Sequence, residues 1–301
     1  MSIEQLNADY GIVGQLRFVV GKGGFPFIEI SSAKASALIS VYAGQVLSFH
    51  PAGEADDLMF LSEKAYYQTG KAIKGGVPIC WPWFGADPAG QGRPAHGFVR
   101  NRLWNVVATE TTADGNIRVT LGLMDTPETR AIWPQSFTLA LEITVGNSLN
   151  LELVTRNTGT QTFPVTQAFH TYFKVGDISQ TSVLGLEGID YIDKTDNSAQ
   201  KQQTGAVMIN TEVDRIYLGV QGELVIDDVA LKRRIRIASR GSKTAVVWNP
   251  WAKISAEMGD LQDDDYRRLL CVETSNAATD VVEIAPNSEF RLVANYRVER
   301  D

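Results

Sequence analysis

The chain has only three histidines, and His170 stands where acid–base chemistry could occur. It closes the run FPVTQAFH and precedes the aromatic residues Tyr172 and Phe173. Burial beside aromatic rings lowers the pKa of a histidine, whereas a nearby carboxylate raises it. Either shift can leave the pKa near neutral, where general acid or base catalysis is efficient. On this segment alone, a hydrogen-bonded core histidine is the simpler interpretation.

Glu273 is the second candidate, because it ends the apolar run LLCV. A carboxylate that closes a buried strand needs a partner, since burying a lone charge is costly. An ion pair with an arginine would satisfy that need. A general base is the functional alternative.

His96 lies in the segment GRPAHGFVRNRLW, between Gly92 and Gly97 and four residues before Arg100. Glycines at these positions indicate a shaped loop, and loops held over a rigid sheet often carry binding residues. A binding histidine and one hydrogen-bonded to the loop backbone fit this segment equally well. We interpret the third histidine, His50, as a structural or surface residue.

Most of the chain predicts short β-strands, which must position these side chains. Phe137–Val145 and Leu149–Thr155 alternate apolar and polar residues, and Gly146-Asn147 between them predicts a hairpin turn. Short helices are expected only from Pro127 to Ile132 and within Asp260–Arg268. So many strands with so little helix predict an all-β antiparallel sandwich. The other strand-like runs are Leu16–Val20, Ala37–Val41, Trp104–Thr109, Ile117–Leu123, Ile216–Val220, Leu224–Asp227, Ile235–Ala238, Ala245–Trp248, Leu269–Glu273 and Phe290–Val298.

The bulk composition limits the possible partners. The 301 residues show no change of composition that would mark a boundary, so we expect one domain over 1–301, with Asp193–Gly205 as a polar loop. A net charge of −7 without a basic tract argues against nucleic acid and anionic membranes as partners. The two cysteines form neither a zinc pattern nor a disulfide framework. No leader or long apolar stretch is evident, so we expect the cytoplasm.

Six segments occur in a recognisable order: KGGVPICWPWFG, RPAHGFVRNRLW, NTGTQTFPVTQAFHTYF, GLEGIDYID, VWNPW and LLCVETSNA. Together they resemble the aldose 1-epimerase superfamily, and specifically its hexose-6-phosphate mutarotase branch, the glucose-6-phosphate 1-epimerases. The resemblance extends from about Lys74 to Ala277. It implies a large β-sandwich, often called a supersandwich, and a mechanism that needs neither metal nor cofactor.

The resemblance also implies roles for individual residues. Glu273 matches the general base and His170 the general acid, while His96 and Asp193 match positions that contact sugar hydroxyls. The implied reaction is the interconversion of the α and β anomers of a hexose 6-phosphate, with D-glucose 6-phosphate as the expected substrate.

Lys74 and Arg100 match basic positions that bind the phosphate, with one difference. The family commonly has arginine where this chain has Lys74, and lysine offers a point charge instead of a two-pronged donor. Ala95 also stands where relatives often have glutamine, which removes one hydrogen-bonding group.

Three other functions stay open on the sequence. A neutral-sugar aldose 1-epimerase would use His170 and Glu273 but not the two cations. A non-catalytic carbohydrate-binding sandwich would explain the tryptophan-rich segments without an acid–base pair. A glycoside hydrolase would need a second carboxylate beside Glu273, for which only Asp193 stands out.

Overall fold

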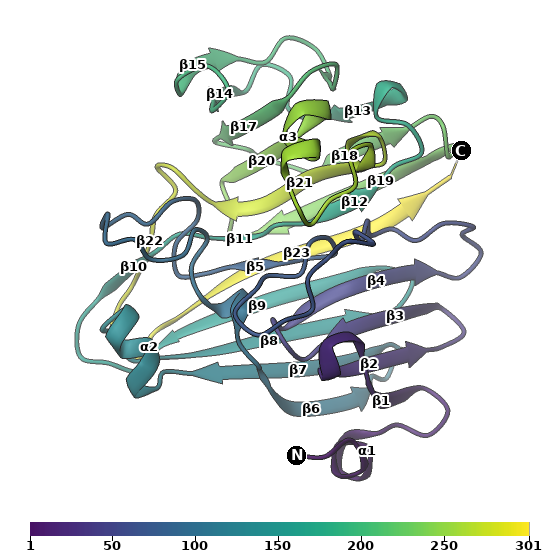
Figure 1. The fold of residues 1–301 in the computed structure, drawn as a ribbon, viewed down its shortest axis with the longest axis vertical. Helices are drawn as coiled ribbons and strands as arrows, with labels where there is room; N and C mark the ends of the chain where they lie inside the picture. Colours follow the sequence, from purple (N-terminus) through teal and green to yellow (C-terminus); the bar gives the residue numbers. More distant parts are fainter. Residues whose placement is uncertain (301) are drawn as a thin grey trace.

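The computed structural model describes residues 1–300, and antiparallel strands make up most of their regular secondary structure (Figure 1). The largest sheet has nine strands. Every neighbouring pair in this sheet is antiparallel. Its order is β16 (Val207–Met208), β13 (Thr181–Leu184), β18 (Leu224–Asp228), β19 (Arg233–Arg240), β23 (Glu289–Glu299), β9 (Leu149–Asn157), β8 (Phe137–Val145), β7 (Ile117–Met124) and β6 (Asn105–Thr111).

An eight-stranded sheet packs against the first. Its order is β15 (Ala199–Gln202), β14 (Asp190–Asp193), β17 (Val213–Leu218), β20 (Thr244–Asn249), β21 (Leu269–Asn276), β11 (Gln167–Phe169) and β5 (Ile79–Cys80), with β12 (Tyr172–Lys174) also paired to β21. The layered all-β architecture predicted from the sequence is therefore confirmed.

A four-stranded sheet extends the second layer. It contains β1 (Leu16–Val20), β2 (Pro26–Ser31), β3 (Ala35–Ser40) and β4 (Gln45–Pro51). A bridge between Val46 and Val77 joins β4 to the segment that leads into β5. A separate pair consists of β10 (Phe163–Val165) and β22 (Val282–Ile284).

Sequence patterning explains the longest strands. Along β8, alternate residues are buried from end to end, as its apolar–polar alternation predicts. The turn between Val145 and Leu149 closes the predicted hairpin with β9. Each predicted strand corresponds to an observed one, although the ends differ by up to three residues.

The predicted helices had mixed outcomes. α2 (Pro127–Ile132) forms as expected, with Thr126 as its N-cap. Within Asp260–Arg268 there is only the 3₁₀ turn η4 (Asp265–Arg267), so the helix expected there is wrong. Two α-helices without a predicted counterpart are α1 (Ile3–Tyr10) and α3 (Trp251–Glu257). The Asn249 side chain accepts from the Trp251 amide, and the backbone turns into α3 directly after Pro250. The remaining 3₁₀ turns are η1 (Lys22–Gly24), η2 (Val99–Asn101) and η3 (Ile178–Gln180).

Asp193–Gly205 is not the open loop that its polar composition suggested. β14 and β15 form a tight antiparallel hairpin, with Asp193 paired to Ala199 in register. No helix within residues 1–300 is long and apolar enough to cross a membrane.

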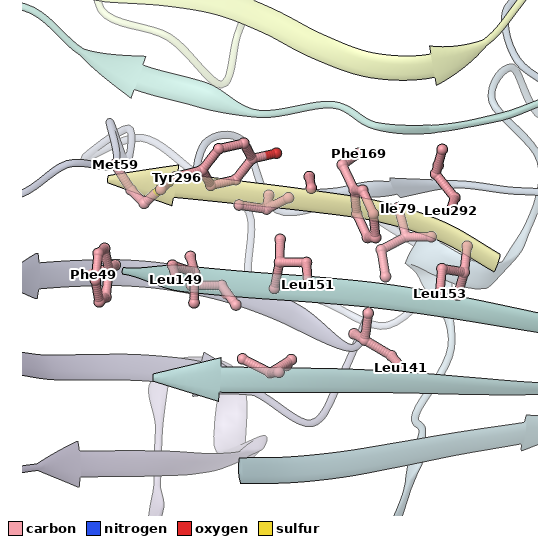
Figure 2. Close-up of a cluster of buried hydrophobic side chains, with 14 of the residues drawn as sticks. Phe49, Met59, Ile79, Leu141, Leu149, Leu151, Leu153, Phe169, Leu292 and Tyr296 are labelled. Atoms are coloured by element: carbon pink, nitrogen blue, oxygen red, sulfur yellow. The ribbon is translucent and has the colours of Figure 1, made fainter. Parts of the chain in front are cut away.

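One buried cluster fills the space between the layers and includes residues from Leu6 to Tyr296. Figure 2 shows its centre, where Leu149, Leu151 and Leu153 of β9 face Phe169 and Ile79 of the other layer. Burial of apolar surface on this scale is the main stabilising contribution to such a fold. Tyr296 carries the one oxygen drawn among these side chains (Figure 2).

Candidate active site

Glu273 lies in the interior of β21, not at its end. The strand continues through Thr274, Ser275 and Asn276, and all eight of its residues are buried. The prediction that Glu273 closes the strand is therefore wrong. Polar residues suggested a strand end, but their side chains hydrogen-bond inside the protein, for example Asn276 Nδ2 to Gly241 O at 2.8 Å.

The strand alternation separates the two faces of the eight-stranded sheet. Leu270 and Val272 point into the main core, whereas Leu269 and Cys271 belong to a separate cluster on the other side. We call that other side the outer face. Glu273 has the parity of Cys271, so its side chain lies on the outer face.

His170 lies opposite Glu273, at a break between β11 and β12. Phe169 pairs with Thr274 and Tyr172 pairs with Cys271, and the same register carried through the break sets His170 against Glu273. The His170 amide donates instead to Pro78 O at 2.9 Å.

The two side chains are in contact but do not satisfy one another. His170 Nδ1 lies 3.4 Å from Glu273 Oε1. Within residues 1–300, His170 Nδ1 and Glu273 Oε2 are buried without a hydrogen-bond partner. Polar atoms without a hydrogen-bond partner are costly to bury. The pair can therefore form hydrogen bonds to a ligand.

Burial sets the protonation of this pair. Burial raises the pKa of Glu273 well above its usual range; Asp214 raises it further and Arg100 opposes the shift. Burial also lowers the pKa of His170 well below 6.5, and the electrostatic effects of His96, Arg100 and Lys74 act in the same direction. Without a ligand, His170 is therefore neutral at pH 7.

His96 stands next to His170, with ring centroids 5.5 Å apart. Its Nδ1 accepts from the Gly85 amide at 3.3 Å and lies 3.3 Å from Cys80 Sγ. Burial, with Arg100 second, lowers the pKa of His96 to about 3. A neutral ring that accepts at Nδ1 carries its proton on Nε2, which can donate to a ligand oxygen.

The left-handed backbone of the His96 loop explains its glycine. His96 has φ 63° and Gly97 has φ 74°. A Cβ at Gly97 would lie 1.8 Å from Trp81 O. Only glycine allows this close approach, which fixes the ring of His96 beside His170.

Arg100 and Lys74 bring positive charge to the same place. Arg100 lies in η2, donates to Ala95 O at 3.0 Å, and has an Nε that is buried without a partner. Lys74 is held by its backbone, since Gln45 Nε2 donates to Ile73 O and Gly75 O on either side of it.

Lys74 already has an anionic neighbour. Its Nζ lies 3.5 Å from Asp260 Oδ2, and the two side chains are only 18% and 20% exposed. Met258 Sδ lies 3.9 Å from the same nitrogen. Asp260 could not be recognised as a partner from the sequence, because 186 positions (260 − 74) separate the two residues.

Asp193 does not join this cluster. It pairs with Arg215, which pairs with Val247 of the main core, so its side chain lies on the core side of the sheet. Its carboxylate accepts from Lys201 Nζ at 2.8 Å and from Thr195 Oγ1 at 2.7 Å. Nothing in this geometry directs Asp193 toward Glu273.

Asp214 is the carboxylate that the sequence reasoning missed. In register it faces Trp248, which faces Cys271 on the outer face. Burial raises the pKa of Asp214 to about 6, and its charge acts on Glu273. The sequence signal that could have indicated Asp214 is an acidic residue within the strand-like segment VDRIYL.

Aromatic rings form the wall beside the pair. The ring of His170 stacks on Tyr172, with centroids 4.9 Å apart and planes at 8°. Trp248 meets the same ring edge-on at 6.2 Å. An acid–base pair beside flat aromatic surfaces and cationic side chains suits a polar ring that carries an anionic group.

Comparisons with known proteins identify the family of the chain. The sequence model of the family "Aldose 1-epimerase" matches residues 26–297. A protein of Escherichia coli (strain K12) described as "Putative glucose-6-phosphate 1-epimerase" is 36% identical over 274 residues, which are 91% of this chain and 90% of that protein. A plant protein of Cenchrus ciliaris with the same description is 37% identical over 85% of this chain and 79% of its own length.

Solved structures give the same result. A crystal structure of a "putative mutarotase (YeaD)" from Salmonella typhimurium superposes with a TM-score of 0.90 at 33% identity, covering 99% of both chains. A galactose mutarotase-like protein from Clostridium acetobutylicum, at 14% identity and a TM-score of 0.74, shares the fold. With most of its length matched by the family model and by these relatives, the chain belongs to the aldose 1-epimerase family.

Proposed function

We propose that this protein interconverts the α and β anomers of a hexose 6-phosphate, with D-glucose 6-phosphate as the substrate. The observation that carries the proposal is the buried pair of His170 and Glu273. The two side chains lie 3.4 Å apart, and each has a polar atom without a hydrogen-bond partner within residues 1–300. The phosphate is supported by the two cations near this pair and by the names of the relatives.

The pair supplies the acid and the base that the reaction needs. Glu273 takes the proton from the C1 hydroxyl while His170 protonates the ring oxygen, so the C1–O5 bond breaks and an open-chain aldehyde forms. C1 then rotates, and the ring closes on its other face as the two protons return. A general acid and a general base each contribute about 10²–10⁴-fold to a rate.

Substrate charge prepares His170 for its role as the acid. Lys74 and Arg100 help to keep His170 neutral in the free enzyme. A phosphate dianion between these cations offsets their charge, which raises the pKa of His170. Binding of the phosphorylated end therefore favours protonated His170 at the reacting end.

The neighbouring residues hold the sugar. The Nε2–H of neutral His96 donates to a sugar oxygen, and Trp248 lies against the apolar side of the ring. We assign to Asp214 the hydroxyl contact predicted for Asp193, because Asp214 lies on the outer face with Glu273.

The test removes the acid and the base separately. In His170→Gln and Glu273→Gln, the enzyme-dependent exchange of glucose 6-phosphate anomers, followed by NMR, should fall about 10²–10⁴-fold. His50→Gln is the matched control, because His50 lies in β4, outside the cluster. Near-normal exchange in either catalytic variant would overturn the assignment, and binding of the sugar phosphate without exchange in the parent would favour a non-catalytic carbohydrate-binding protein.

A neutral-sugar epimerase is the second candidate, favoured by the contact between Lys74 and Asp260. A lysine with a carboxylate partner offers less net charge to a phosphate. Faster exchange of free glucose than of glucose 6-phosphate would select this alternative.

For the compartment we propose the cytoplasm, supported by two thiols, Cys80 and Cys271, that stay unpaired.

A further inference from the structure

Tyr296 connects the nine-stranded sheet to the back of the catalytic strands. It lies in β23, and its side chain is fully buried. The Tyr296 Oη lies 2.6 Å from Thr171 Oγ1. The side chain of Thr274 lies near the same hydroxyl.

These two threonines directly follow the catalytic pair in the sequence. Thr171 comes after His170, and Thr274 comes after Glu273. Because successive side chains point to opposite faces, the threonines face the core while His170 and Glu273 face the ligand. The Tyr296 hydroxyl therefore holds the strand of His170 from behind, through Thr171, and lies beside the threonine that follows Glu273.

The break between β11 and β12 makes this link important. The two strands pair with β21 on either side of His170 and Thr171, but these two residues form no ladder pair of their own. The amides of both residues bond elsewhere, to Pro78 O and Phe169 O. The side chain of Thr171 thus supplies the contact that fixes the break against the core.

Thr274 has a hydroxyl partner of its own in the nine-stranded sheet. Thr274 Oγ1 lies 2.7 Å from Ser239 Oγ of β19. Each of the two threonines is therefore hydrogen-bonded to a hydroxyl of the nine-stranded sheet, and buried hydrogen bonds of this kind rigidify the groups that they connect.

We propose that Tyr296 is a positioning residue for catalysis, which sets the distance between His170 and Glu273 by holding the strand of His170 in place through Thr171. The proposal rests on the proposed function of that pair. It goes beyond that function because Tyr296 has no access to the substrate. Small displacements of reacting groups are expensive, since about 1 Å can cost about 10²-fold in rate.

The test is Tyr296→Phe, which removes the hydroxyl and keeps the ring. We expect kcat for anomer exchange to fall about tenfold, within that limit, while KM changes by less than about twofold. The matched control is Tyr217→Phe. Tyr217 is equally buried, and its hydroxyl donates to Gln203 Oε1 at 2.7 Å in the same core. Both variants should lose similar thermal stability, but only Tyr296→Phe should lose kcat.

A second variant keeps the test decisive if Tyr296→Phe does not fold. Thr171→Val should lower kcat by a similar factor, and Thr171→Ser, which keeps the hydroxyl, should restore most of it. Since the two hydroxyls act as one unit, adding Tyr296→Phe to Thr171→Val should cost little more.

The outcomes separate this proposal from the function on which it rests. A parent-like kcat in Tyr296→Phe and Thr171→Val, with exchange abolished in His170→Gln, would overturn the positioning role and leave the proposed function intact. Equal loss of kcat in Tyr296→Phe and Tyr217→Phe would also overturn it. Unchanged exchange in His170→Gln would overturn both.

Discussion

The two cations of the site should contribute unequally to phosphate recognition. Arg100 donates a single hydrogen bond to a backbone carbonyl, and its Nε has no partner. Lys74 must first loosen its 3.5 Å contact with Asp260. A phosphate therefore gains a nearly free guanidinium but has to compete for the ammonium group.

The expected magnitudes follow from this difference. A hydrogen bond to a charged group contributes about 1.5–3 kcal/mol, and about 1.4 kcal/mol corresponds to a factor of ten. Arg100→Met should therefore raise KM for glucose 6-phosphate about 10- to 100-fold. Lys74→Met should raise KM for glucose 6-phosphate less, by about tenfold at most. When Lys74 binds the phosphate it loses its contact with Asp260, and this loss offsets part of the gain. Asp260→Asn should lower KM for glucose 6-phosphate.

The assay is NMR exchange between the two anomers, measured with glucose 6-phosphate and with glucose. Variants of Arg100 and Lys74 should change KM for the phosphorylated sugar and leave that for glucose nearly unchanged. Arg102→Met is the matched control, because Arg102 lies two positions after Arg100 but is occupied by Glu128 at 3.6 Å and by the ring of Phe98. Equal effects on both sugars, or a higher KM in Asp260→Asn, would refute the reasoning.

Three further predictions concern stability. Because burial raises the pKa of Glu273 above 4.5, the folded protein loses stability as pH rises past that value, so calorimetry should find Glu273→Gln more stable than the parent at pH 8 but not at pH 4. Leu151→Ala empties space in the core of Figure 2 and should cost about 3–5 kcal/mol in urea unfolding. Gly97→Ala places a Cβ against Trp81 O, so it should lower Tm and raise KM together.

Each of these has a contrary outcome. A parent-like pH dependence in Glu273→Gln would mean that its carboxylate is not buried as described. A loss below about 1 kcal/mol in Leu151→Ala would mean that the core collapses around the smaller side chain. An unchanged KM in Gly97→Ala would separate the loop from ligand binding.

The fold was accessible from the sequence because its long strands alternate. β8 and β9 are buried on every second residue, and the hairpin between them was predicted from Gly146 and Asn147. Short strands such as β5 and β12 span only two or three residues, too few for a period to appear.

The site was accessible in part. His170, Glu273 and His96 were found by residue type and by the segments around them, and the structure brings them together. Asp193 shows what a sequence cannot decide, because a difference of one residue in parity moves a side chain to the other face of a sheet. Only the register of the strands shows that Asp214, and not Asp193, lies on the outer face.

Tyr296 and Asp260 were beyond sequence reasoning for another reason. Each acts on a residue more than a hundred positions away, Tyr296 on Thr171 and Asp260 on Lys74. These contacts form only when the layers pack together, so no local sequence pattern predicts them. The same holds for the polar end of β21, which is buried by contacts to β20.

The most direct test of the central claim is the exchange rate between α- and β-glucose 6-phosphate, measured by NMR with the spontaneous rate subtracted. The parent should accelerate exchange catalytically. His170→Gln and Glu273→Gln should each return the rate close to the spontaneous one while keeping the folded spectrum. Parent-like acceleration by either variant, or none by the parent, would contradict the account.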